Sequence, residues 1–151
     1  SVQEEVGLRG AGVAAYDIEP DLAVVLEGTT ASDVPESKEE EYSTVVNEGP
    51  AFTVMDATII PNQKLLQNLI QIADEEEIEY QFRRSTKAGT DAGRIHLLKE
   101  GIPTAVVSVP VRYIHAPTSL LNLDDYHAAS NLLDYFCQKL AQGGINLARD
   151  N

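Results

Sequence analysis

Residues 104–114 read TAVVSVPVRYI, a run of β-branched and apolar residues that is the strongest strand signal in the chain. A second apolar run, LAVVLE at 22–27, lies between Pro20 and Gly28 and is typical of a buried strand. Two weaker segments, AFTVMD at 51–56 and EYQFRR at 79–84, also have strand character. The sequence therefore predicts four strands spread along the chain.

Segments with helical periodicity lie between these strands. Residues 7–15 (GLRGAGVAA) carry small residues at helical spacing, which allows a helix to lie close to a sheet. Asn62 is placed to cap a second helix, whose apolar stripe follows i, i+3, i+4 spacing: Leu65, Leu66, Leu69, Ile70 and Ile72. A third helix is expected from about Asp91 to Glu100, before Gly101. A fourth is expected from about Asp124 to Ala141, with four side chains facing inward: Leu132, Leu133, Phe136 and Leu140.

This alternation of strands and helices predicts the α/β fold class. We expect a mostly parallel or mixed sheet with helices on both faces, because parallel neighbours need a crossover connection. A chain of 151 residues is most simply one domain, spanning 1–151. Residues 33–43 (DVPESKEEEYS) are charged and contain proline, which favours a solvated loop.

Composition excludes some classes of partner. The formal charge of −13 counts against nucleic acid and against anionic membrane, because both require a basic face. No apolar run approaches the roughly 20 residues that cross a bilayer. The single cysteine, Cys137, rules out an intrachain disulfide, as a reducing cytoplasm would predict. We therefore expect a cytoplasmic protein.

Four residues with metal-binding or acid–base chemistry fall at expected strand ends. Glu4 and Glu5 stand in SVQEEVG, Glu27 closes LAVVLE, and His115 follows VPVRYI. Because ligands bind beyond the carboxyl ends of strands in such sheets, these donors suit a zinc-like ion there. Simpler explanations stay open for each: a favourable helix N-terminus for the glutamate pair, a solvated strand end for Glu27, and a turn for His115. A glycosidase is disfavoured, because adjacent carboxylates cannot flank a sugar.

The loop Gly89-Thr90-Asp91 is bracketed by glycines and enters an expected helix. Thr90 or Asp91 could serve only as a helix N-cap. Alternatively, the loop could approach a substrate, with Asp91 paired to an amine. Residue pattern alone leaves both possibilities open.

Three motifs in this order, VQEEVGLRGA, GTDAG and VPVRYIHAP, resemble those of the cytoplasmic tetrahedral aminopeptidases. This family of dinuclear metallopeptidases includes FrvX-like proteins and members with older names as endoglucanases. The resemblance implies that Glu4 is the general base and that Glu5, Glu27 and His115 are metal ligands. It also implies that Gly89, Thr90 and Asp91 lie close to the substrate. This chain has His-Ala-Pro where the family has His-Ser-Pro, which leaves the ligand intact.

The resemblance further implies two divalent metal ions, zinc or cobalt, short peptide substrates, and a homo-oligomer in which dimers build a dodecamer. In the family, another histidine and a bridging aspartate come from upstream of the Glu-Glu motif. We therefore expect 1–151 to be the C-terminal portion of a catalytic domain, incomplete at the N-terminus and of negligible activity alone. Alternatives are a non-catalytic packing module and another zinc-dependent hydrolase, such as a deacylase.

Overall fold

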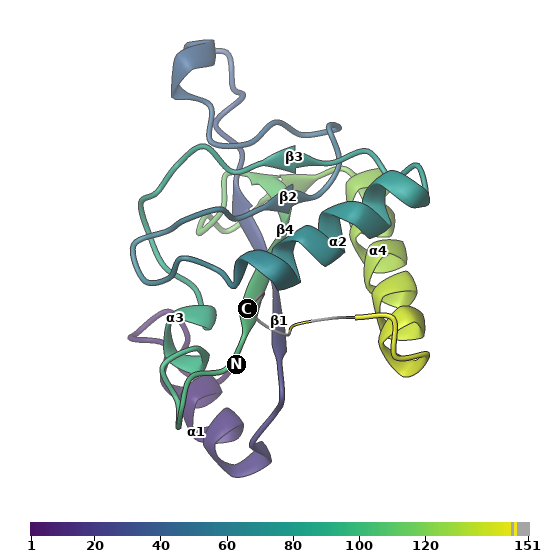
Figure 1. The fold of residues 1–151 in the computed structure, drawn as a ribbon. Coiled ribbons are helices and arrows are strands. Elements are labelled where there is room, and N and C mark those ends of the chain that lie inside the picture. The colour runs from purple at the N-terminus through teal and green to yellow at the C-terminus, as the bar shows by residue number, and fades with distance from the viewer. Residues whose placement is uncertain (146, 148–151) are drawn as a thin grey trace.

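A computed structural model describes residues 1–145 and 147 of the chain. Its centre is a five-stranded sheet in the order β1-β4-β2-β3, with β5 paired to the far end of β4 (Figure 1). The strands are β1 Ala23–Thr30, β2 Ala51–Phe52, β3 Gln81–Phe82, β4 Thr104–Arg112 and β5 Leu120–Leu121. β1 runs parallel to β4, and β2 runs parallel to β3. β2 and β5 run antiparallel to β4, so the sheet is mixed.

Helices cover both faces of this sheet. The helices are α1 Arg9–Ile18, α2 Gln63–Glu75, α3 Ala92–Ile95 and α4 Leu123–Ala141, and a 3-10 turn, η1, spans Glu39–Glu41. Figure 1 shows α2 and α4 together on one face and α1 beside α3 on the other. The predicted α/β class, with a mixed sheet flanked by helices, is confirmed.

The central strand β4 is buried on both faces, as its apolar run predicts. Ala105 and Val107 enter the larger core, which α2 and α4 close with residues such as Leu69 and Leu132. Val106 points to the opposite face, into a smaller core formed with Ile59, Ala92 and Val25. Because successive strand residues face opposite sides, a strand covered by helices on both sides is apolar along most of its length.

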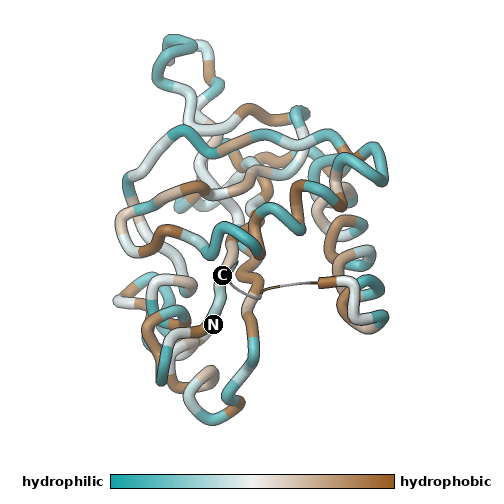
Figure 2. The backbone as a smooth tube through the Cα atoms, in the orientation of Figure 1, coloured by the Kyte–Doolittle hydropathy of each residue, from teal (hydrophilic) through white to brown (hydrophobic). Residues whose placement is uncertain are grey.

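The α2 helix begins where its sequence predicts. The Asn62 side chain accepts a hydrogen bond of 3.0 Å from the Leu65 backbone N–H, which satisfies one of the first free donors of the helix. The protruding loop that carries η1 is mostly hydrophilic, in agreement with the expectation for 33–43 (Figure 2).

Several predicted boundaries are wrong. The strands expected at 51–56 and 79–84 pair over only two residues each, and the helix expected over 91–100 is regular only from Ala92 to Ile95. The strand expected at 22–27 instead continues to Thr30, because it pairs with β4 along its whole length. β5 had no sequence signal. The strand boundaries differ because the length of a strand depends on its pairing with a partner strand, and the local sequence does not specify that partner.

Leu140 was expected to face inward, but it is 41% exposed. Lys139, in the same turn of α4, pairs with Glu75 at the end of α2. The last turn of α4 therefore lies at the rim of the core, where a side chain is only partly covered. Within the described residues, no helix is both long and apolar enough to cross a membrane.

Candidate active site

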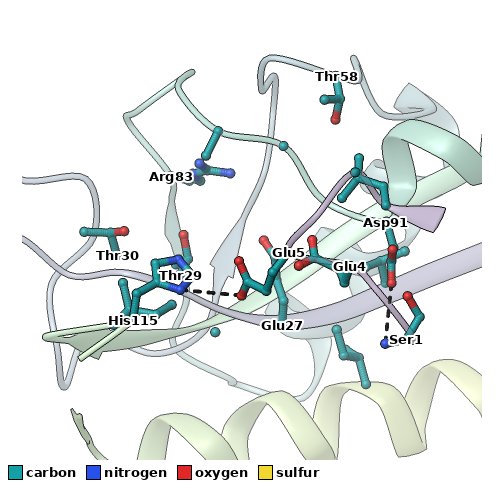
Figure 3. Close-up of a pocket in the computed structure, with 18 residues that line it drawn as sticks. Ser1, Glu4, Glu5, Glu27, Thr29, Thr30, Thr58, Arg83, Asp91 and His115 are labelled. Atoms are coloured by element: carbon teal, nitrogen blue, oxygen red, sulfur yellow. Dashed lines mark ion pairs between the residues drawn. The ribbon is translucent and has the colours of Figure 1, made fainter. Parts of the chain in front are cut away.

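A cavity of about 690 Å³ lies along residues 25–30 of β1 and beside the turn that follows β4 (Figure 3). Its walls come from segments far apart in sequence: the turn at 1–8, residues 25–30 of β1, Thr58, the loop at 83–91 and the turn after β4. It adjoins the carboxyl ends of β1 and β4, the edge at which ligands bind in open α/β sheets. The predicted site residues that line it are Glu4, Glu5, Glu27, Gly89, Asp91 and His115.

Glu4 and Glu5 lie in a turn, not at the end of a strand as expected. The turn is closed by hydrogen bonds from the Leu8 N–H to the Glu4 carbonyl (2.9 Å) and from the Gly10 N–H to the Val2 carbonyl (2.8 Å). A Cβ at Gly10 would lie 2.4 Å from the Val2 oxygen, so the turn requires glycine there. Neither glutamate lies in the first turn of α1, which the helix-dipole explanation would require.

The two glutamates face different neighbours. Glu5 Oε1 lies 3.5 Å from His115 Nδ1, and both side chains remain largely exposed (Figure 3). The pKa of Glu4 is raised from its ordinary value, first by partial burial and then by the negative charges of Glu5 and Asp91. A carboxyl group with a raised pKa accepts and returns a proton more readily near neutral pH.

Glu27 lies in the middle of β1, because that strand continues past it. Its register partner across the sheet is Ser108 of β4, whose Oγ donates a long hydrogen bond of 3.4 Å to Glu27 Oε1. Burial raises the pKa of Glu27 to about 7, against the opposing effects of Arg83 and of the Ser108 hydrogen bond. The half-buried carboxyl group would therefore favour a cation beside it.

His115 follows the end of β4 and has a positive φ of 66°. The turn that carries it is closed by the Ala116 N–H, which donates to the Tyr113 carbonyl at 3.1 Å. The imidazole faces the Glu5 carboxylate across the cavity mouth (Figure 3). His115 is thus a turn residue, and the turn directs its ring toward the acidic cluster.

Thr90 does not reach the cavity. It is buried, and its hydroxyl accepts a hydrogen bond of 3.2 Å from the Ala92 N–H at the start of α3. The neighbouring Asp91 makes no capping bond; its Oδ2 lies 3.8 Å from the amino group of Ser1, and its Oδ1 is buried without a hydrogen-bond partner among the described residues. Thr90 therefore supports the loop, and Asp91 is the residue of this pair that a ligand can contact.

A buried polar turn that sequence reasoning missed supports the glycine loop. Asp56 Oδ1 accepts hydrogen bonds from the Thr58 N–H (2.7 Å), the Thr58 hydroxyl (2.8 Å) and the Ile59 N–H (3.0 Å). Thr58 in turn lies against Gly89 and Gly93, where an added Cβ would come within 2.2 Å and 2.3 Å of its side-chain atoms. The glycines of GTDAG are thus required because the loop packs directly on Thr58.

Arg83 is a second residue that the sequence analysis missed. It follows β3, lines the cavity and is only 7% exposed, while its neighbour Arg84 is exposed. Because side chains alternate along an extended chain, the pair Arg83-Arg84 at a strand end predicts that one arginine faces inward. Which of the two does so depends on the pairing of β3 with β2.

The carboxylate and imidazole groups of the cavity are suitable ligands for a divalent cation, but only some of them are close enough together to bind the same ion. Carboxylate and imidazole are ligands of zinc and cobalt, and Glu5 and His115 are close enough to share one ion. Crowded carboxylates and the raised pKa values of Glu4 and Glu27 indicate negative charge that a cation would offset. Among the described residues, however, no three donor side chains form a group that could hold a metal. The structure therefore brings two of the three predicted ligands together and places Glu27 in the same cavity.

Comparison with known proteins gives a consistent result. The lysyl aminopeptidase of Pyrococcus furiosus is 38% identical over 126 residues, which are 83% of this chain and 35% of that protein. The solved TET aminopeptidase of Thaumarchaeota archaeon SCGC AB-539-E09 is 41% identical, with a TM-score of 0.89 over 93% of this chain and 39% of that one. The Pyrococcus horikoshii TET1 peptidase, which can assemble into a tetrahedron or a large octahedral shell, is 28% identical, with a TM-score of 0.71 over 90% and 38%.

The chain spans between 35% and 41% of the length of the curated relatives it matches. The family model described as M42 glutamyl aminopeptidase matches residues 1–132, which include every predicted site residue. The resemblance to the tetrahedral aminopeptidases is confirmed, and the chain belongs to the M42 glutamyl aminopeptidase family.

Proposed function

We propose that this chain forms part of the active site of a metal-dependent aminopeptidase that releases N-terminal residues from short peptides. One observation carries the proposal: a single cavity in a member of this peptidase family gathers Glu4, Glu5, Glu27, Asp91 and His115 from four separate segments. A folded protein rarely places so many carboxylates together without a cation or a cationic ligand.

Glu5, Glu27 and His115 would hold the metal, which we propose to be two divalent ions, zinc or cobalt. Such ions supply Lewis-acid activation of water and of a peptide carbonyl. Glu4, whose pKa is raised by burial and by neighbouring carboxylates, would take the proton from water and pass it to the leaving amine. Asp91, which lines the cavity, would bind the α-ammonium group that defines the substrate as an N-terminus.

Three ligands are too few for two metal ions, because even one zinc ion in a catalytic site commonly has three protein ligands. Since the relatives are more than twice as long as this chain, we propose that 1–151 is the C-terminal portion of a catalytic domain and that further ligands lie elsewhere in the protein. A cytoplasmic homo-oligomer of the kind that the TET1 peptidase forms would be its working state.

Metal binding and turnover test this proposal separately. Zinc and cobalt are titrated calorimetrically into the 151-residue chain and into the His115→Asn and Glu5→Gln variants, with His127→Asn, an exposed residue of α4, as the matched control. We expect weak binding to the parent chain and to the control, and about tenfold weaker binding or more in the two cavity variants. Equal affinity in all four proteins would contradict the assigned ligands.

Aminoacyl-anilide hydrolysis is then measured with and without chelator. The 151-residue chain alone is expected to show negligible turnover, whereas a longer form with the remaining ligands should turn over in a metal-dependent way. In that form, Glu4→Gln should abolish turnover while preserving metal affinity, because Glu4 moves a proton and holds no ion. Robust hydrolysis by the 151-residue chain would overturn the shared-site arrangement.

A further inference from the structure

Arg83 has no role in the reaction proposed above, yet its side chain is nearly buried beside the cavity. Its backbone N–H donates to the Phe52 carbonyl at 2.9 Å, so the edge of β2 sets the position of Arg83. Its terminal nitrogen Nη2 donates to the Lys87 carbonyl. Arg83 therefore ties the end of β3 to the middle of the loop that follows.

Asp56 provides the counter-charge that holds the guanidinium in place. Arg83 Nη1 lies 4.0 Å from Asp56 Oδ2, close enough for an ion pair but beyond hydrogen-bond distance. Arg83 Nε and Asp56 Oδ2 are both buried without hydrogen-bond partners among the described residues. Because separating the two would leave unpaired charges in the interior, the ion pair keeps Arg83 directed at the turn that begins at Asp56.

The loop that Arg83 grips is otherwise weakly held. Residues 86–88 are exposed, and Ala88 has a positive φ of 65°, which a residue with a Cβ rarely adopts. The Ala57 N–H donates to the Ala88 carbonyl at 3.0 Å, next to the Lys87 carbonyl that Arg83 binds. An exposed and strained segment keeps one conformation only where such contacts determine it.

The same loop ends at Asp91, on the cavity wall. Asp91 Oδ2 lies 3.8 Å from the amino group of Ser1, so an ammonium group is already placed near this carboxylate. Figure 3 shows Arg83 and Asp91 at separate places around the cavity. An effect of Arg83 on a ligand of Asp91 would therefore pass through the loop that joins them.

We propose that Arg83 is a positioning residue, which fixes the loop 84–91 through the Lys87 carbonyl and so holds Asp91 where it receives the α-ammonium group of a peptide. This inference rests on the proposed function, which assigns that ammonium group to Asp91. Arg83 does not touch the ligand. It orders the loop before the ligand arrives, and a preordered site binds more tightly because less conformational entropy is lost on binding.

The test uses binding, so it does not depend on catalysis. Leucine amide and 4-methylpentanamide, which differ only in the α-amine, are titrated by NMR into the metal-free 151-residue chain. Ser1 is acetylated, so that its own amino group does not compete for Asp91. We expect leucine amide to bind about tenfold more tightly than the amine-free probe, and Asp91→Asn to bring this ratio of affinities to about one.

Arg83→Met should lower the ratio to about three and should have no further effect on it in the Asp91→Asn background. A general loss of structure would weaken both probes equally and leave their ratio unchanged. A ratio that Arg83→Met does not change, or a decrease that persists in the Asp91→Asn background, overturns the proposal.

Matched variants localise the effect. Arg84→Met, an exposed neighbour, should leave the ratio unchanged, and Arg83→Lys, which keeps the positive charge, should restore part of it. Because Arg83→Met leaves Asp56 buried without its counter-charge, the double variant Arg83→Met with Asp56→Asn provides a charge-balanced form. The double variant should keep the low ratio, and recovery of the full ratio in it would overturn the proposal.

Amide hydrogen exchange gives a readout that needs no ligand. The Ala57 N–H, whose acceptor is the Ala88 carbonyl, should exchange about tenfold faster in Arg83→Met, while the Leu69 N–H of α2 should not change. Equal acceleration at both amides would contradict a local role for Arg83. A parent ratio of one would refute the ammonium role of Asp91 in the proposed function, whereas a tenfold ratio that survives Arg83→Met would refute this inference alone.

Discussion

Replacement of Glu27 by glutamine in the metal-free chain should stabilise the protein at pH 8 but much less at pH 5. The pKa of Glu27 rises from 4.5 to about 7 on folding, because half-burial disfavours the charged carboxylate. A group with a raised folded-state pKa contributes stability that is fully present below about pH 4.5 and is lost as the pH rises through about 7. Glutamine removes this pH-dependent loss.

The pKa change corresponds to about 3 kcal/mol at most, since one unit is about 1.4 kcal/mol. Part of that is lost to solvent screening, because the carboxyl group retains some exposure. We therefore expect the difference in unfolding free energy between Glu27→Gln and the parent chain to increase by about 2 kcal/mol between pH 5 and pH 8. Comparison across pH cancels the pH-independent effects of the substitution.

Urea unfolding in the presence of EDTA, followed by circular dichroism at both pH values, measures this difference. Glu36→Gln, on the exposed loop, is the control and should show no comparable pH dependence. Zinc at pH 8 should then stabilise the parent chain more than the Glu27→Gln variant, because only the native carboxylate can bind the ion. A free-energy difference that is constant with pH, or that falls as the pH rises, would refute the assigned burial of Glu27.

Three further predictions concern residues that stabilise the fold. Gly89→Ala should destabilise the chain by about 1–3 kcal/mol, because its Cβ would lie 2.2 Å from Thr58 Cγ2, and Thr58→Ser should recover part of the loss in thermal unfolding. Asp125→Ala should cost about 2–4 kcal/mol in urea unfolding, since its two oxygens accept bonds of 2.7 Å and 2.9 Å from loop N–H groups; a loss below about 0.5 kcal/mol would contradict this role. Asn62→Ala should lower the free energy of unfolding by about 1 kcal/mol, because it removes the cap on the Leu65 N–H. Asn62→Asp can still accept that hydrogen bond and should keep most of the stability of the parent chain.

Much of the fold could be predicted because its signals are local. The buried strand β4 and the stripe and N-cap of α2 follow from periodicity and capping within a few residues of sequence. The two-residue strands β2 and β3 could not be bounded in this way. Their extent depends on pairing, in which Ala51 lies opposite Ser108 of β4 and Gln81 lies beside Ala51.

The residues of the candidate site likewise fall into two groups, those that local motifs identify and those that only the folded structure identifies. The Glu4-Glu5 pair, Asp91 and His115 were identifiable because they lie in motifs whose order along the chain is distinctive. Arg83 was not identifiable, since its neighbour Arg84 has the same side chain and only the strand pairing decides which one faces inward. Thr90 could not be separated from Asp91 by sequence, because only the folded loop shows that Thr90 is buried and that its hydroxyl accepts a bond from the Ala92 N–H.

The sequence by itself determined the α/β class, the position of the central strand and the residue types available for chemistry, because periodicity, caps and motifs are properties of neighbouring residues. Only the tertiary structure decided that β2 and β5 run antiparallel to β4, that Glu27 lies within a strand, and that Glu5 faces His115. These features depend on contacts between segments as much as 110 residues apart, and such contacts form only when the sheet assembles.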